Sequence, residues 1–397
     1  MKENIKEQKL SPMRYIRNNK RRVSVLVISL SLCLAIIYVA NFLVMSTDAT
    51  ARRLFLDSME NKCVIGFSFV DDDFTEEQIN ELDTLSDKEY SKKYIEFVND
   101  KYREYAKMLE GEDNIVKAIP IRNLLISVKP PIGMLGSNIA LVESEYADIL
   151  LKHNDAKLIE GKLPEKPNEI VLDKATMLNN GFKIGDKCNE RYTITGILEC
   201  DLYYGYGIID NRMYTGLQIL SKKRIDDART LFPLIGREYD SEYNFVDDYN
   251  TENKWFVEDI TIQFEQATKY LYLGIFILLF VSLFVVYTTY LRDRHNEWCL
   301  YCSIGYSRKA IYCSIICELL FTFITAVLIG IIIAFGLVLS LDAIMMKPNG
   351  IACQYLYPDK IIEIICAFVL FFGLLQIPIR YALYKIRTID AMEDDIY

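Results

Sequence analysis

Hydrophobic residues gather in four long runs and are not spread evenly along the 397-residue chain. The runs cover residues 23–46, 270–291, 310–341 and 361–379. The first two contain no charged residue, and the last two contain one glutamate each, Glu318 and Glu363. A helix needs about 20 apolar residues to cross the hydrocarbon core of a bilayer. The pattern therefore predicts four transmembrane helices.

The one long polar segment, residues 47–269, separates the first two runs. Residues 75–109 carry apolar side chains at helical intervals, and Thr75 with Gln78 fits a capping box at the start of this helix. Residues 114–128 resemble a strand. The sequence thus predicts an α-helical membrane protein with an α+β extracytoplasmic domain inserted between helices 1 and 2.

Lys and Arg are distributed unequally among the short segments that flank the runs. Residues 1–22 hold eight of them, 292–309 hold four, 380–397 hold three and 342–360 hold two. Basic flanks stay on the cytoplasmic side. Both chain termini and the 292–309 loop are therefore expected in the cytoplasm, with 47–269 and the short 342–360 loop outside.

The net charge of −9 divides unevenly between the two sides of the membrane. Residues 47–269 carry 28 basic and 42 acidic side chains. The basic surface lies only beside the membrane, where it meets anionic lipid headgroups of the bilayer. This arrangement argues against binding of nucleic acid.

No set of residues forms a recognisable catalytic or metal site. The chain has two histidines, His153 and His295, which are expected on opposite sides of the membrane, so they cannot share one zinc ion. Cys299 and Cys302 have metal-ligand spacing but lack a second pair. No phosphate-binding G-x-x-x-x-G-K-[ST] loop occurs. We expect no enzymatic activity, metal or cofactor in this chain; whether the outer cysteines form disulfides stays open.

Residues 157–199 carry an ordered series of turn signals. They predict a strand at 169–172, a helix at 174–179 ended by Gly181, a hairpin-type turn at Gly185-Asp186 and a strand at 191–198. The positions that carry the pattern are Gly161, Pro164, Asn168, Glu169, Ile184, Gly185, Asp186 and Gly196. In this order they resemble the outer domain of MacB-type ABC transporter permeases.

The loop between the second and third runs predicts a helix, a tight turn and a second helix. Trp298 and Tyr301 lie on one helical face, Gly305 ends the turn and Ser307 can cap the next helix. The loop resembles the MacB/FtsX family at Arg294, Glu297, Gly305, Ser307, Ile311 and Glu318. Trp298 and Tyr301 depart from it, because smaller aliphatic residues are common at these positions.

Glu318 lies within the third run, about two turns from its cytoplasmic end. Ionisable residues inside a membrane are costly and are often functional. Two interpretations stay open for Glu318: a structural hydrogen bond to a neighbouring helix, or a place in a moving part.

The resemblance implies a permease subunit of an ABC transporter in a bacterial cell membrane. A separate cytoplasmic ATPase would hold ATP and Mg and press on a coupling region formed by Arg294, Glu297, Gly305, Ser307 and Arg308. The motion would reach the outer domain of this chain and of a second permease copy or a homologous permease, and would expel peptide, antibiotic or lipid-linked cargo. The alternative is an FtsX-like subunit that regulates an extracytoplasmic cell-wall hydrolase, with the hydrolase or an adaptor as a further partner. A sensor or adhesion protein without an ATPase is a third interpretation.

Overall fold

The computed structural model describes residues 16–200, 203–355 and 358–385. The chain divides into two compact units. The helical unit comprises Met1–Phe42, Glu265–Leu341 and Tyr355–Tyr397, and the sheet unit comprises Leu43–Phe264 and Asp342–Gln354. Most of the basic segment predicted at 1–22 and the end of the 380–397 tail lie outside the described residues.

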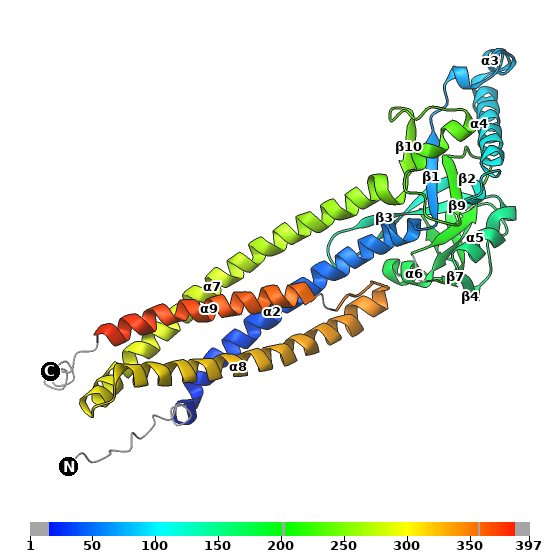
Figure 1. Ribbon diagram of the computed structural model, residues 1–397. Helices are drawn as coiled ribbons and strands as arrows, with labels where there is room; N and C mark the ends of the chain where they lie inside the picture. Colours follow the sequence, from blue (N-terminus) through cyan, green and yellow to red (C-terminus); the bar gives the residue numbers. More distant parts are fainter. Residues whose placement is uncertain (1–15, 201–202, 356–357, 386–397) are drawn as a thin grey trace. The chain divides into compact units, whose positions relative to one another are not determined.

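Four long helices carry the four apolar runs (Figure 1). They are α2 (Lys20–Phe55), α7 (Lys254–Ser303), α8 (Arg308–Leu341) and α9 (Pro358–Lys385). Within the described residues, two segments are long and apolar enough to cross a membrane, Val23–Met59 and Arg308–Asn349. Both α2 and α7 extend well beyond the predicted runs, because apolar composition marks only the part of a helix that suits lipid and not where the helix ends.

A single cluster of buried side chains joins all four helices in the helical unit. Val27 of α2, Trp298 of α7, Phe323 of α8 and Ile379 of α9 belong to it. Because each helix contributes apolar side chains to the same core, the helices pack as one bundle.

The sheet unit is built on a ten-stranded sheet with the order β10-β1-β9-β2-β3-β8-β5-β7-β4, in which β6 pairs with β7. The strands are β1 (Lys62–Phe67), β2 (Ile115–Val128), β3 (Leu135–Val142), β4 (Lys157–Gly161), β5 (Glu169–Asp173), β6 (Lys187–Cys188), β7 (Tyr192–Glu199), β8 (Gly205–Ile208), β9 (Gly216–Ser221) and β10 (Asn244–Asp247). The 14-residue β2 pairs with β9 through its first half and with β3 through its second half, and so links the two parts of the sheet.

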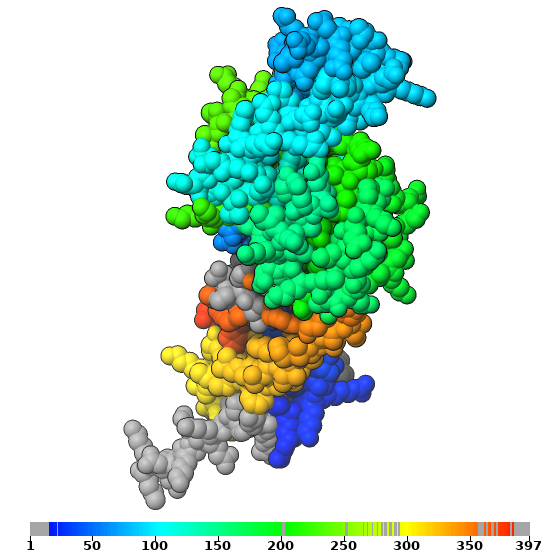
Figure 2. All heavy atoms as spheres, turned by 90° about the vertical axis from the view of Figure 1, so that its right-hand side faces the viewer, coloured from blue at the N-terminus to red at the C-terminus, as the bar shows by residue number. Residues whose placement is uncertain are grey.

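Helices cover the sheet and complete two hydrophobic cores. The larger core includes Tyr102 and Leu109 of α4 (Asp87–Leu109), and the smaller one includes Leu150 of α5 (Ala147–His153). Figure 2 shows the cyan surface of α4 and the adjoining α3 at one end of this unit. The predicted α+β character of residues 47–269 agrees with these elements.

The helix expected over residues 75–109 is divided into two helices. Thr75 and Gln78 form the predicted capping box at the start of α3 (Glu76–Asp83), but α4 begins separately with a second capping box, Ser86 with Glu89. The single-helix expectation was wrong, because the Glu89 carboxylate accepts a hydrogen bond from the Ser86 N–H (3.4 Å) and a new helix starts there.

The predicted turn residues after β4 form a compact corner. Glu169 accepts hydrogen bonds from the backbone N–H groups of Glu165 (2.9 Å) and Lys166 (3.1 Å), and these bonds lower the pKa of its carboxyl group. Pro164 is buried within the same corner. The carboxylate therefore holds the turn that leads into β5.

Gly161 and Gly196 face each other where β4 pairs with β7. A Cβ added at Gly161 would lie 2.3 Å from the Thr195 carbonyl oxygen, and one added at Gly196 would lie 2.6 Å from the Lys162 carbonyl oxygen. These glycines are needed because the two backbones approach too closely for any side chain.

The hairpin predicted at Gly185-Asp186 turns at a different place. Gly185 (φ +96°) and Asp186 form a turn bonded to β7, through Gly185 N–H to the Ile194 carbonyl (2.8 Å). The hairpin between β6 and β7 turns at Asn189 and Glu190, which both have positive φ. The sequence did not indicate this turn, because such turns usually carry Asn-Gly and glutamate rarely takes that conformation.

Gly161 and Gly185 offer a matched test of close packing, because both have positive φ but only Gly161 has neighbouring backbone within 4 Å. Gly185→Ala should lower the free energy of unfolding by about 1–2 kcal/mol, the cost of the left-handed conformation. Gly161→Ala should cost about 1–3 kcal/mol more, because its Cβ also overlaps backbone atoms. Urea denaturation of the two full-length variants measures both values. Equal losses would show that the β4–β7 contact tolerates a side chain.

Candidate functional site

The turn between α7 and α8 has the geometry of a Schellman motif. Gly305 has a φ of +101°, its N–H donates to the Cys302 carbonyl (3.1 Å), and the Tyr306 N–H donates to the Tyr301 carbonyl (3.0 Å). The Ser307 hydroxyl then accepts from the Ala310 N–H (3.2 Å) and caps α8. The predicted helix, tight turn and second helix are present.

A buried ion pair ties the end of α7 to α8. Arg294 Nη1 lies 2.6 Å from Glu318 Oε2, and each side chain is 7% exposed. Arg294 Nε also contacts Glu297 at 3.2 Å, and its guanidinium lies over the Trp298 ring, 5.6 Å from the centroid. Glu318 therefore bonds to a neighbouring helix, one of the two arrangements left open by the sequence.

The residues predicted for coupling occupy two different environments. Arg294 is buried, whereas Glu297, Gly305, Ser307 and Arg308 are exposed around the turn. The exposed turn and the buried charged contact are thus joined by about three turns of each helix, since Arg294 lies nine residues before the end of α7 and Glu318 ten residues after the start of α8. Whether an ATPase binds this turn is a separate question, taken up below.

Trp298 anchors the turn region from inside the bundle. Its side chain is 1% exposed and belongs to the cluster shared by the four helices. Tyr301 packs against the same cluster, and its ring meets Tyr306 edge-on at 5.9 Å. The two bulky residues that depart from the family pattern therefore fill the core beside the ion pair.

Cys299 and His295 lie one turn apart on α7, with 3.3 Å between the thiol sulfur and Nδ1 of the ring. Over the described part of the chain, no group of three or more His, Cys, Asp or Glu side chains is placed to hold a metal ion. In the sheet unit, Cys63 and Cys188 are buried free thiols.

A close crossing of α2 and α8 was not predicted from the sequence. The Ser31 hydroxyl donates to the Ala326 carbonyl (2.8 Å), and a Cβ added at Gly330 would lie 3.1 Å from the Ser31 carbonyl oxygen. A buried hydroxyl between membrane helices needs such a partner. Gly330 and Gly336 lack G-x-x-x-G spacing, so the sequence motif gave no signal for this contact.

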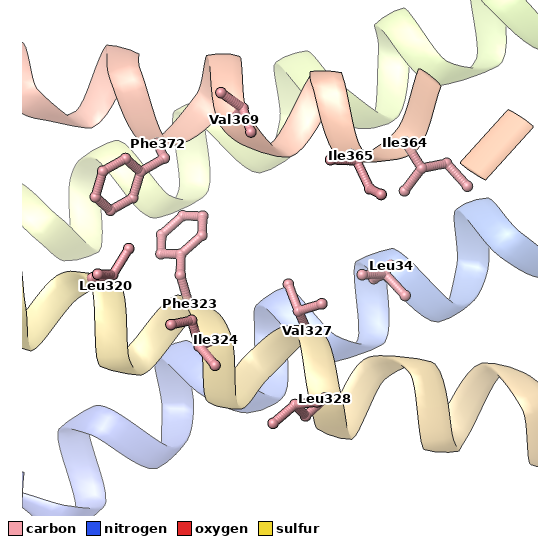
Figure 3. Close-up of a pocket in the computed structure, with 10 residues that line it drawn as sticks. All are labelled: Leu34, Leu320, Phe323, Ile324, Val327, Leu328, Ile364, Ile365, Val369 and Phe372. Atoms are coloured by element: carbon pink, nitrogen blue, oxygen red, sulfur yellow. The ribbon is translucent and has the colours of Figure 1, made fainter. Parts of the chain in front are cut away.

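An apolar cavity of about 330 Å³ lies between α2, α8 and α9 in the helical unit (Figure 3). Figure 3 shows Phe323 and Phe372 facing each other at one side, with ring centroids 5.4 Å apart and ring planes at 80°. Every lining residue is apolar. The cavity offers no polar group that could orient a polar ligand.

The loop between α8 and α9 is held within the sheet unit. Residues 342–354 belong to that unit, and an added Cβ at Gly350 (φ +60°) would lie 2.3 Å from the Ala175 carbonyl oxygen. Ala175 belongs to α6 (Lys174–Asn180). Glycine is therefore required where the loop crosses α6.

Hydrogen bonds fasten this loop to the same surface. The Tyr203 hydroxyl donates to the Gly350 carbonyl (2.9 Å) and accepts from the Ala352 N–H (3.3 Å). The Asn179 side-chain amide donates to the Asn349 carbonyl (3.1 Å). The sequence indicated only a short outer loop, because none of these partners is near it in the chain.

A buried carboxylate organises the loop itself. Asp342 is 2% exposed, contacts Lys347 Nζ at 2.8 Å and accepts a hydrogen bond from the Cys353 thiol at 3.1 Å. Burial, together with this hydrogen bond, raises the pKa of Cys353 to about 12. The thiol therefore stays protonated at neutral pH and remains a donor.

Comparison with known proteins places the bundle in a family. Residues 270–391 match the family described as FtsX-like permease C-terminal. This part of the chain is similar to FtsX-like permeases. This match confirms the MacB/FtsX-type resemblance expected from the sequence. In that family of ABC transporter permeases, ATPase activity lies in a separate subunit.

Two solved structures have a distant likeness to the permease. The periplasmic region of MacB from Actinobacillus actinomycetemcomitans is 13% identical, with a TM-score of 0.26 over 51% of this chain and 94% of that one. The extracellular domain of the noncanonic ABC-type transporter YknZ from Gram-positive bacteria is 13% identical, with a TM-score of 0.22 over 43% of this chain and 89% of that one. No curated protein sequence matches the permease.

The ion pair can be tested against a matched exposed carboxylate, because Arg294 contacts both Glu318 and Glu297. Glu318→Ala should destabilise the permease by about 3–5 kcal/mol, since it leaves the Arg294 charge buried without compensation. Glu297→Ala removes a half-exposed partner (50%) and should cost less than about 1 kcal/mol. Chemical denaturation of the detergent-solubilised permease measures both losses.

A double variant, Arg294→Met with Glu318→Leu, should recover much of the stability lost in Glu318→Ala, because no charge is then buried. If Glu318→Ala were as mild as Glu297→Ala, the pair would not stabilise the bundle.

Gly330 and Gly336 provide a second matched pair in α8. Gly330→Val should destabilise the permease by about 1–3 kcal/mol, because its side chain would press α2 away from α8. Gly336→Val should be close to neutral, since no atom lies within 4 Å of the position of an added Cβ. Thermal unfolding in detergent measures both, and equal effects would contradict the close crossing.

Proposed function

We propose that this permease is the membrane subunit of an ABC transporter and couples ATP hydrolysis by a separate ATPase to motion of its sheet unit. Four membrane-spanning helices would place residues 47–269 and 342–360 outside, with both termini in the cytoplasm. The outward export of peptide, antibiotic or lipid-linked cargo by this motion is the function we favour. A second permease copy or a homologous permease would complete the assembly.

The observation that carries the proposal is the buried contact of Arg294 with Glu318 between the two helices that the exposed turn joins. A force applied at the turn would act on a helix end whose register against α8 is held by a charge-assisted hydrogen bond. The Schellman turn at Gly305 joins the two helices through residues 304–307 alone. This short connection limits how far one helix end can move from the other. This is the geometry expected of a region that receives force and passes it on.

Two chain connections support transmission to the sheet unit. The helices α2 and α7 each continue without a break from one unit into the other. In addition, the loop that follows α8 is fastened to α6 through Gly350, Tyr203 and Asn179. A displacement of α8 along its axis would therefore pull on the sheet unit directly.

ATP and Mg would be held by the partner ATPase. The sequence has no phosphate-binding loop of its own. The residues of this chain would bind the ATPase and carry its motion.

The test is a bulky substitution in the turn. Gly305→Trp, in the permease co-purified with its ATPase, should reduce permease-stimulated ATP hydrolysis about fivefold or more, the range of a typical coupling free energy. Gly236→Trp is the control, because Gly236 also has positive φ and no atom within 4 Å but lies in the sheet unit. Unchanged stimulation in Gly305→Trp would overturn the coupling role.

The alternative is a signalling subunit that activates an extracytoplasmic cell-wall hydrolase, favoured by the FtsX-like description of the matched family. Export predicts that a deletion strain becomes sensitive to cationic peptides or macrolides. Signalling predicts that the sheet unit retains a hydrolase or its adaptor in affinity purification, with drug sensitivity unchanged.

A further inference from the structure

A polar cleft of about 280 Å³ lies in the sheet unit, apart from the α7–α8 turn. The C-terminal turn of α2 forms one wall, and strands β1, β2, β3, β9 and β10 contribute most of the rest. Its volume is close to the lower end of the range for small-molecule sites. The cleft is large enough for a ligand of roughly dipeptide size, given about 30 Å³ for each water it would replace.

The cleft contains a lysine that forms no ion pair with any carboxylate of the described residues. Lys62 begins β1 and shares a strand face with Val64, since alternate residues of a strand lie on one face. Val64 belongs to the smaller core, and Lys62 continues that face into the cleft. Burial lowers the pKa of Lys62, and Asp247 opposes this effect. An unpaired ammonium group in such a place would gain from an incoming anion.

A buried amide lies beside this lysine. Gln218 of β9 pairs with Val64 in the sheet, lines the cleft and is only 3% exposed. Among the described residues, its side-chain amide has no hydrogen-bond partner. Because the side chain lines the cleft, a polar ligand there could bond to both the donor and the acceptor of this amide.

Two further amides face the cleft from the other half of the sheet. Asn123 of β2 and Asn138 of β3 are diagonal neighbours, because Asn123 pairs with Ala140. The lining thus combines the cation of Lys62 and the carboxylate of Asp247 with four neutral amides, of which Asn253 is hydrogen-bonded to Asp247. Such a set suits a ligand with one negative charge and several hydrogen-bonding groups.

Asp247 limits the charge that the cleft can accept. It pairs with Val64 from the opposite side to Gln218, lines the cleft, and is hydrogen-bonded to Asn253. A dianion such as phosphate would be repelled by this carboxylate, whereas a single carboxylate can contact Lys62 and remain away from Asp247.

We propose that the cleft binds a small polar ligand with one carboxylate, which pairs with Lys62 while its amide or hydroxyl groups bond to Gln218, Asn123 and Asn138. A peptide C-terminus and a uronic-acid sugar both have this chemistry. The site does not depend on coupling to an ATPase.

Titration calorimetry on the full-length protein in detergent tests the site. N-acetyl-glycylglycine and glucuronate are the carboxylate probes, and N-acetyl-glycylglycine amide and glucose are their uncharged counterparts. At least one acid should bind about tenfold more tightly than its uncharged counterpart, and inorganic phosphate should bind more weakly than that acid. Binding of only the peptide acid or only glucuronate identifies the source of the carboxylate.

Lys62→Met should weaken binding of that acid about tenfold or more, and Lys62→Arg should retain most of it. Lys157→Met is the control, because the Lys157 side chain is 76% exposed on β4. Binding should also take up a fraction of one proton above neutral pH, because the carboxylate restores the charge of a lysine whose pKa burial has lowered. The dependence of the binding enthalpy on the buffer measures this uptake in the unsubstituted protein.

Three results would overturn the site: neither acid binds more tightly than its uncharged counterpart, phosphate binds most tightly, or Lys62→Met binds as well as Lys157→Met. If Lys62→Met does not fold, the comparison of each acid with its uncharged counterpart and with phosphate in the unsubstituted protein decides alone.

Discussion

The helical unit depends on one buried ion pair, Arg294 with Glu318. Each charge would be prohibitively costly in an apolar bundle without the other, so the pair fixes which turn of α7 meets which turn of α8. Trp298 covers the guanidinium, and the adjoining Schellman turn connects the two helices within a few residues. Packing of the four helices around this point then follows from ordinary apolar contact.

In the sheet unit, positions where two backbones approach each other closely fix which segments can meet. Gly161 and Gly196 allow β4 and β7 to meet, and Gly350 allows the loop after α8 to lie against α6. At these contacts a side chain would displace backbone atoms and not a flexible neighbour. The loop after α8 is further fixed by hydrogen bonds from Tyr203 and Asn179, all within the sheet unit.

Much of the architecture could be predicted because it depends on local pattern. The apolar runs marked the four long helices, Thr75 and Gln78 marked the start of α3, and Gly305 with Ser307 marked the turn between α7 and α8. The errors arose where several local signals competed or were atypical. Ser86 started a second helix within an apparently continuous pattern, and Asn189-Glu190 made a hairpin turn without glycine. The partner of Glu318 could not be read from spacing, although both residues of the pair had been singled out.

The sequence by itself determined the segregation of apolar runs from a polar domain, the absence of a phosphate-binding loop and the turn signals that the family resemblance rests on. These properties depend on composition and on neighbours within a few residues. Tertiary structure alone decided that Arg294 meets Glu318, that Gly330 lies on Ser31 and that Lys62, Gln218 and Asn138 share one cleft. These groups are far apart in the chain, and only the pairing of strands and the packing of helices bring them together.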